Sequence, residues 1–261
     1  MKRFAVDIYW VFWREMKRFF MQKTRIFMSV IQPMLWLVLM GSNLAGLAKG
    51  AAAGGMLGHS ENYLAFMTPG IMIMTALFGG VFGGMSVLWD RRLGFLNKML
   101  AAPIHRAAIP LGKLAGLMVQ SWIQVVVIVL VATVMGVRIV TGIPGVLAML
   151  LLASLFGIIM GGISLALAAR ITSMEALFAV TNFLTMPLMF TSNAMFPTRA
   201  MPPWMQHIAA VNPLSYAVAP MRMIASVGWQ WHMIAANTLV LLALALASAL
   251  LAISQFNRAI A

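Results

Sequence analysis

Long apolar segments constrain this chain more than any other feature of its sequence. About 20 apolar residues are needed for a helix to cross a bilayer, and lipid offers no partner for an unpaired backbone N–H or C=O. The sequence therefore predicts an all-α membrane protein with a single transmembrane domain over residues 1–261. The six expected transmembrane helices are Ile26–Leu47, Leu64–Leu88, Leu114–Val137, Val146–Ala169, Ala176–Met195 and Met233–Ile253.

Composition supports a lipid environment. Hydrophobic residues make up 62% of the chain and charged residues 9%, with a mean hydropathy of +0.95. A soluble domain carries about a quarter charged residues, so this chain cannot cover itself in water. Its net charge of +13 would indicate nucleic acid in a soluble protein. Here the basic residues stand between apolar segments, so we expect membrane lipid and no nucleic acid as a partner.

The distribution of Lys and Arg predicts the orientation. With the N-terminus inside, 14 of the 18 Lys and Arg fall in segments that face the cytoplasm. Short cytoplasmic loops are enriched in these residues. We therefore expect a multi-pass protein of the cytoplasmic (inner) membrane with both termini in the cytoplasm.

Residues 1–23 have the pattern of an amphipathic helix. At 100° per residue, basic residues share one arc and aromatic residues the opposite arc, which is typical of a helix lying in the membrane interface. A helix docked on protein is the alternative. The basic arc holds Arg3, Asp7, Arg14, Lys17 and Arg18; the apolar arc holds Ile8, Tyr9, Phe12, Trp13, Met16, Phe19 and Phe20.

Two of the segments between the spans carry patterns of their own. Residues 90–101 predict a short amphipathic helix that ends before Pro103, and such a helix could dock on a cytoplasmic partner or only set topology. Residues 196–231 are apolar but broken by prolines. They predict short re-entrant helices before the last span, tolerated where they pack against protein.

Two motifs resemble the type-2 ABC export permeases of the daunorubicin-resistance and nodulation branch. The first is Asp90-Arg91, Gly94, Leu96, Leu100, Ala102-Pro103, Arg106 and Leu111-Gly112-Lys113; the second is Asn212-Pro213-Leu214-Ser215-Tyr216, followed by Arg222. Both lie in the correct loops and order. The chain departs from the family at Arg92 and Asn97, where Glu is common, which implies a different charge pattern for docking.

The resemblance implies the transmembrane subunit of an exporter for a drug, a lipid or a lipid-linked glycan. It implies a second permease subunit, as a homodimer, and two copies of a separate ABC ATPase that hold ATP and Mg²⁺. The coupling helix over 90–101 would contact that ATPase. The coupling residues implied are Asp90, Arg91, Gly94, Leu96, Leu100 and Pro103, and the re-entrant motif is Asn212, Pro213 and Tyr216.

The chain itself shows no sign of an active site. A phosphate-binding loop needs Gly-x-x-x-x-Gly-Lys followed by Ser or Thr, whereas Gly112-Lys113 is followed by Leu114 and has Ala107 at the first glycine position. Cysteine is absent and no two histidines have metal-ligand spacing. We therefore expect no catalytic, cofactor-binding or metal-binding residues on this chain, and no enzymatic activity of its own.

Two other functions stay open on the residues alone. An ion-coupled secondary transporter would usually place an ionisable residue at mid-membrane, and none lies near the centre of an expected span. A non-catalytic structural membrane subunit needs no chemistry. The glycines at small-x-x-x-small spacing in the second and fourth spans, such as Gly80 with Gly84 and Gly157 with Gly161, would then pack helices within a subunit or between subunits.

Overall fold

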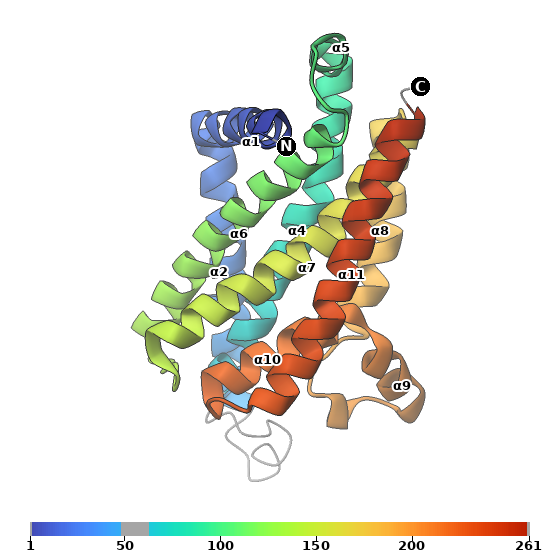
Figure 1. Cartoon of the computed structure of the whole chain (residues 1–261). Coiled ribbons are helices and arrows are strands. Elements are labelled where there is room, and N and C mark those ends of the chain that lie inside the picture. Colours follow the sequence, from blue (N-terminus) through green and yellow to red (C-terminus); the bar gives the residue numbers. More distant parts are fainter. Residues whose placement is uncertain (1, 48–62, 260–261) are drawn as a thin grey trace.

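The computed structural model describes residues 2–47 and 63–259, and this part of the chain is helical throughout apart from short connections. Figure 1 shows the helices as one bundle. The elements in chain order are α1 (Lys2–Met21), α2 (Lys23–Leu47), α4 (Tyr63–Arg92), α5 (Phe95–Ala101), α6 (Ala108–Val134), α7 (Gly142–Arg170), α8 (Met174–Phe190), the 3-10 turn η1 (Thr198–Ala200), α9 (Pro203–Val211), α10 (Pro213–Ser226) and α11 (Trp231–Ala259).

Helices α4, α6, α7 and α11 are each long and apolar enough to cross a bilayer. They contain the second, fourth and sixth expected spans, and the third as far as Val134. Two shorter apolar helical stretches, Ile26–Leu39 in α2 and Met174–Phe190 in α8, stand where the first and fifth spans are expected. The all-helical architecture predicted for the chain is therefore confirmed.

Small residues set the packing of α4 on α7 at the centre of the bundle. The Oγ of Ser164 donates to the backbone oxygen of Val81 at 2.7 Å and accepts from the backbone N–H of Gly84 at 3.2 Å. A side chain at Gly80 would overlap Met160 and Gly161. Because both helices belong to one chain, this small-residue spacing packs helices within the subunit.

The two ends of the bundle differ. In Figure 1 α1 lies across one end, α5 projects from that end, and both marked termini are there. Helices α9 and α10 lie at the opposite end. We call these the α5 end and the α10 end.

The helix expected over residues 90–101 is two helices. Helix α4 continues through Arg92, and α5 begins at Phe95 after a turn in which Gly94 has φ +70°. The left-handed conformation is open to glycine and costs other residues about 1–2 kcal/mol, so the chain changes direction here. Ala102, which precedes Pro103, is extended at ψ 150° and ends α5.

Candidate coupling site

A buried carboxylate organises the α5 end. Asp90, in the last turn of α4, is fully buried. Its Oδ1 lies 2.6 Å from Arg14 Nη2 and 3.0 Å from Arg18 Nη1, and its Oδ2 lies 2.6 Å from Lys113 Nζ. The carboxylate thus joins α4 to both α1 and α6. We call Arg14, Glu15, Arg18, Asp90 and Lys113 the charge cluster.

Lys113 is the second buried member of the charge cluster. Its side chain is 1% exposed, and Nζ donates to Glu15 Oε1 at 2.8 Å and to Ser86 Oγ at 3.0 Å. All three donor hydrogens of the ammonium group therefore have a partner, counting Asp90. Removing one partner of a buried ion pair costs about 3–5 kcal/mol because the other charge stays buried and uncompensated.

Helix α1 uses two faces. Val11, Met16 and Phe19 are buried, and a side chain at Gly112 would overlap Val11, so α1 lies directly on α6. The expected alternative of a helix docked on protein therefore describes this face. Another face stays open: its large exposed side chains are Val6, Tyr9, Trp10, Trp13, Phe20 and Met21.

The basic arc of α1 also differs from expectation. Arg14 and Arg18 turn toward Asp90 and keep 30% and 24% of their side chains exposed. They are partners of a buried carboxylate rather than a solvated face. The Asp90 carboxylate bonds to α1 through these two arginines. Because Asp90 is buried, a partner protein would first contact the residues around it.

A second link ties α1 to the connection between α5 and α6. Asp7 Oδ2 accepts from the backbone N–H of His105 at 3.1 Å and lies 2.7 Å from its Nδ1. The hydrogen bonds from the His105 side chain and backbone hold the pKa of Asp7 below its usual value. Phe4 packs edge-to-face on the same imidazole, with 5.4 Å between ring centroids.

The remaining residues expected to couple lie around α5. Leu96 is buried and Leu100 half-buried, so both face the bundle, while Pro103 is exposed just beyond α5. Leu93 and Phe95 project outward, 58% and 44% exposed. The guanidinium of Arg14 lies over the Phe95 ring at 5.2 Å and Lys98 Nζ lies 5.5 Å from the ring centroid.

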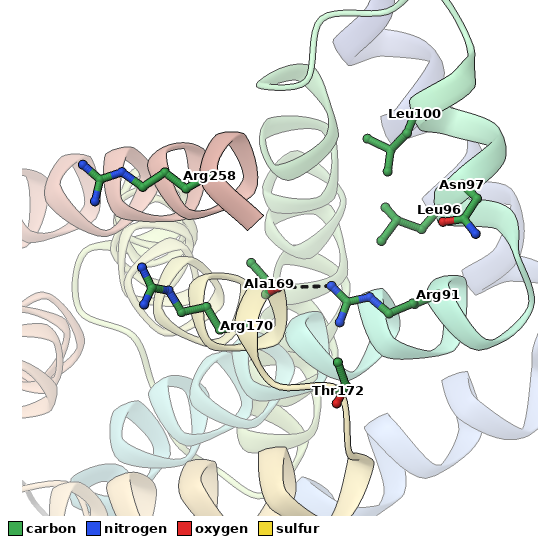
Figure 2. Close-up of a pocket in the computed structure, with 8 residues that line it drawn as sticks. All are labelled: Arg91, Leu96, Asn97, Leu100, Ala169, Arg170, Thr172 and Arg258. Carbon is green, nitrogen blue, oxygen red and sulfur yellow. Dashed lines mark hydrogen bonds between the residues drawn. The ribbon is translucent and has the colours of Figure 1, made fainter. Parts of the chain in front are cut away.

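A cavity of about 610 Å³ lies between α5 and the ends of α7 and α11. Figure 2 shows Arg91 reaching to the backbone oxygen of Ala169, with the leucines of α5 on one side of that contact and two further arginines on the other. The Arg91 Nη2 to Ala169 oxygen distance is 3.1 Å. The cavity is lined by Arg91, Leu96, Asn97, Leu100, Ala169, Arg170, Thr172 and Arg258.

The motif at the α10 end joins α10 to α8. Asn212 caps α10, its Oδ1 accepting from the Leu214 N–H at 2.9 Å, and its Nδ2 donates to the Leu188 oxygen at 2.9 Å. Pro213 occupies the first helical position, where its missing N–H costs nothing. Tyr216 lines a second cavity of about 350 Å³.

Arg222, behind this motif, is half-buried and bonded on several sides. Its guanidinium lies 3.7 Å from the centroid of the Phe66 ring, Nε donates to the Phe66 oxygen at 3.2 Å, and Nη2 donates to the Asn193 oxygen at 2.8 Å. Arg222 thus fastens α10 to α4 and to the turn after α8. The motif around Asn212 lies at the α10 end of the bundle and the motif around Asp90 at the α5 end.

Sequence reasoning missed the role of two residues of the α5 end. Lys113 stands just before the third expected span, but it lies inside α6 and bonds to Asp90. Glu15 is absent from both arcs of the expected helix. The available signal was the scarcity of acids, because the chain has only 5 Asp and Glu against 18 Lys and Arg, and an acid among apolar residues needs a partner.

Known proteins give the same family as the sequence motifs. The family model described as ABC-2 type transporter matches residues 6–226. The transport permease ycf38 of Cyanophora paradoxa is 33% identical over 218 residues, which cover 80% of this chain and 72% of the relative. The daunorubicin resistance ABC transporter permease protein DrrB1 of Streptomyces coeruleorubidus is 27% identical over 210 residues, covering 80% and 71%.

A further relative is the doxorubicin resistance ABC transporter permease protein DrrC of Mycobacterium tuberculosis, 24% identical over 200 residues that cover 74% of this chain and 67% of the relative. The matched region takes in α5, the charge cluster and the Asn212 motif. The resemblance inferred from the two motifs is therefore confirmed, and the chain belongs to the ABC-2 type transporter family.

Proposed function

We propose that this chain is the transmembrane subunit of an ATP-driven exporter of the cytoplasmic membrane, coupled through α5 to a separate ATPase subunit that binds ATP and Mg²⁺. Cargo would be a drug, a lipid or a lipid-linked glycan. The drug-resistance names of two relatives support the first of these. Two copies of the chain, as a homodimer, and two ATPase subunits complete the assembly.

The topology proposed is six spans with the α5 end in the cytoplasm. Helices α2 and α8 provide the first and fifth spans beside the four longer ones. The basic residues of α1, of α5 and of the last turn of α4 support this orientation through their abundance at the α5 end. Helices α9 and α10 would then be the re-entrant segment of the outer leaflet.

The observation that carries the proposal is the bonding of α5's neighbour Asp90 to two other helices. A displacement of the exposed Leu93 and Phe95, at the start of α5, would be transmitted to α4 through the turn at Gly94. It would then pass through Asp90 to Arg14 of α1 and Lys113 of α6. Closely packed, hydrogen-bonded elements move together, so an ATPase gripping α5 has a direct connection to the spans.

The test is co-expression with the ATPase encoded beside this chain, purification by a tag on this chain, and measurement of bound ATPase and its hydrolysis rate. Gly94→Arg puts a bulky residue where φ is +70°, and Leu96→Glu puts a charge in a buried position. We expect both to weaken the complex or to disconnect hydrolysis from transport.

The matched control is Gln230→Glu, because Gln230 is a polar, exposed residue in the connection between α10 and α11 at the opposite end. It should retain ATPase in wild-type amount. Normal co-purification and transport in Leu96→Glu would refute coupling through α5. A well-folded wild-type chain that binds no ATPase would favour a structural subunit or an ion-coupled transporter.

A further inference from the structure

The cavity beside α5 carries an unbalanced positive charge. Of the eight described residues that line it, three are arginines and none has a carboxylate side chain. They come from three different helix ends: Arg91 from α4, Arg170 from α7 and Arg258 from α11. A cation at a helix C-terminus interacts favourably with the exposed carbonyls, which is a sufficient reason for each arginine taken alone. It does not explain why three arginines line the same cavity.

Among the residues that the structure describes, Arg91 and Arg170 each donate a single hydrogen bond, so other N–H groups of both guanidiniums stay available. Arg91 gives one Nη2 hydrogen to Ala169, and Arg170 gives Nε to Gln255 Oε1 at 2.7 Å. Gln255 precedes Arg258 by three residues, which places it on the same face of α11. Arg170 is therefore held against the last turn of α11 near Arg258, and Figure 2 shows both on the side of Ala169 away from α5. Neighbouring guanidiniums repel unless an anion lies between them.

The other half of the cavity is apolar. Leu96 and Leu100 extend from α5 toward the end of α7, as Figure 2 shows. Arg170 ends an apolar helix and Arg258 lies in the last turn of another, each long enough to span a bilayer. In the six-span topology proposed above, on which this inference rests, their guanidiniums would lie at headgroup depth. Basic pockets between transmembrane helices at this depth suit anionic lipid headgroups.

We propose that the cavity between α5, α7 and α11 binds the phosphate group of an anionic phospholipid, with Arg170 and Arg258 on the phosphate, Arg91 as a third cation, and Leu96 and Leu100 closing the side of the cavity toward α5. A phosphate has several acceptor oxygens and can be approached from different helices at once, in geometry that suits guanidinium groups. The bound phosphate would link the ends of α4, α7 and α11.

A partner's acidic side chain fits the same charges less well. It would have to enter between α5 and the bundle. A partner would first meet Leu93, in the turn before α5, and Phe95, the first residue of α5, because both side chains project outward. The phosphate would be held by Arg170 and Arg258, whereas a partner would first meet Leu93 and Phe95, so the two contacts can be lost separately.

The test is native mass spectrometry of the purified full chain in detergent with dioleoyl phosphatidylglycerol, dioleoyl phosphatidylcholine or inorganic phosphate. The variant is Arg170→Gln/Arg258→Gln. Its control is Arg92→Gln/Arg106→Gln, which removes the same charge from exposed residues of the same end that do not line the cavity. Retention of phosphatidylglycerol should exceed that of phosphatidylcholine and fall about tenfold or more in the variant only.

Arg258→Gln alone guards against misfolding, since Arg258 is exposed in the last turn of α11, and it should lower retention by a smaller factor. Competition by millimolar inorganic phosphate would support the phosphate site with a soluble source. Equal loss in variant and control, or equal retention of both lipids, would overturn the proposal. So would a double variant that keeps lipid but loses co-purified ATPase, because the cavity would then accept a partner's acidic group.

Discussion

Lys113 and Asp90 lie 23 residues apart in the chain and meet with 2.6 Å between Nζ and Oδ2, both side chains almost wholly removed from solvent. The pair fastens the first turns of α6 to the last turn of α4. Arg14 and Glu15 then add α1 to the same group of charges. Three helices therefore depend on one carboxylate at the place where α5 leaves the bundle.

Asp90→Asn should destabilise the protein strongly. The amide keeps the shape but leaves Arg14, Arg18 and Lys113 with Glu15 as the one carboxylate of the charge cluster, and we expect a loss of about 3 kcal/mol in the free energy of unfolding. Thermal unfolding of the purified chain in detergent measures it. In Asp90→Asn/Lys113→Met the buried cation is also gone, so the double variant should be more stable than the sum of single effects predicts. Simple additivity would show that the two groups do not interact.

Two glycines of α4 offer a matched pair of tests. A Cβ at Gly84 would overlap the backbone of Ser164, whereas a Cβ at Gly79 meets only Gln124 Oε1 at 4.0 Å. Gly84→Ala should cost about 1–3 kcal/mol through overpacking. Gly79→Ala should be neutral or stabilising by up to about 1 kcal/mol, because alanine is the better helix former. Equal effects in unfolding experiments would contradict the close approach of α4 and α7.

Replacement of Gly94 should act through backbone conformation alone. No atom lies within 4 Å of a Cβ built there, yet φ is +70°. Gly94→Ala is expected to cost about 1 kcal/mol, and Gly94→Asn less, because asparagine enters the left-handed region more readily. The measurement is ATPase co-purification together with thermal unfolding. A larger defect for Asn than for Ala would show that side-chain size, not φ, limits this position.

The link between Asp7 and His105 should give a pH dependence at the acid side. Because the pKa of Asp7 is held below its usual value by hydrogen bonds from His105, its stabilising contribution is present above the ordinary aspartate pKa. That contribution is lost as pH falls through the lowered pKa of the folded protein. Unfolding temperatures of the wild-type chain and Asp7→Asn should therefore differ at pH 6 and converge as the pH falls below the ordinary aspartate pKa of about 3.9 and through the lowered pKa of the folded protein. A gap that stays constant over this range would exclude the carboxylate as its source.

Much of the fold follows from the apolar segments. Their lengths predict helices in the right places, because a backbone in lipid has no other way to pair its polar groups. The bounds shift where local chemistry intervenes: α6 ends at Val134, just before Gly136 with φ +91°, and α8 ends at Phe190. These turns depend on packing against α10 and α4, which no single segment encodes.

The coupling region shows where prediction from sequence stops. A helical wheel over 90–101 assumes one continuous helix, and the glycine at 94 reads equally well as a small helical residue or a break. Pairing of Asp90 with Lys113 depends on how α4 and α6 cross, which hydropathy does not report. Motif resemblance found Asp90, but its inward direction and its partners Arg14 and Arg18 follow only from the fold.

The open aromatic face of α1 has a mechanical consequence. Trp10, Trp13 and Phe20 are more than 50% exposed, and the same helix is bonded to Asp90 through Arg14 and Arg18. If α1 lies in the bilayer surface, its bonds to the end of α4 hold α5 at a constant distance from that surface. A thinner or thicker bilayer would then shift the α10 end relative to the lipid, while the distance from the membrane at which an ATPase meets α5 stays the same.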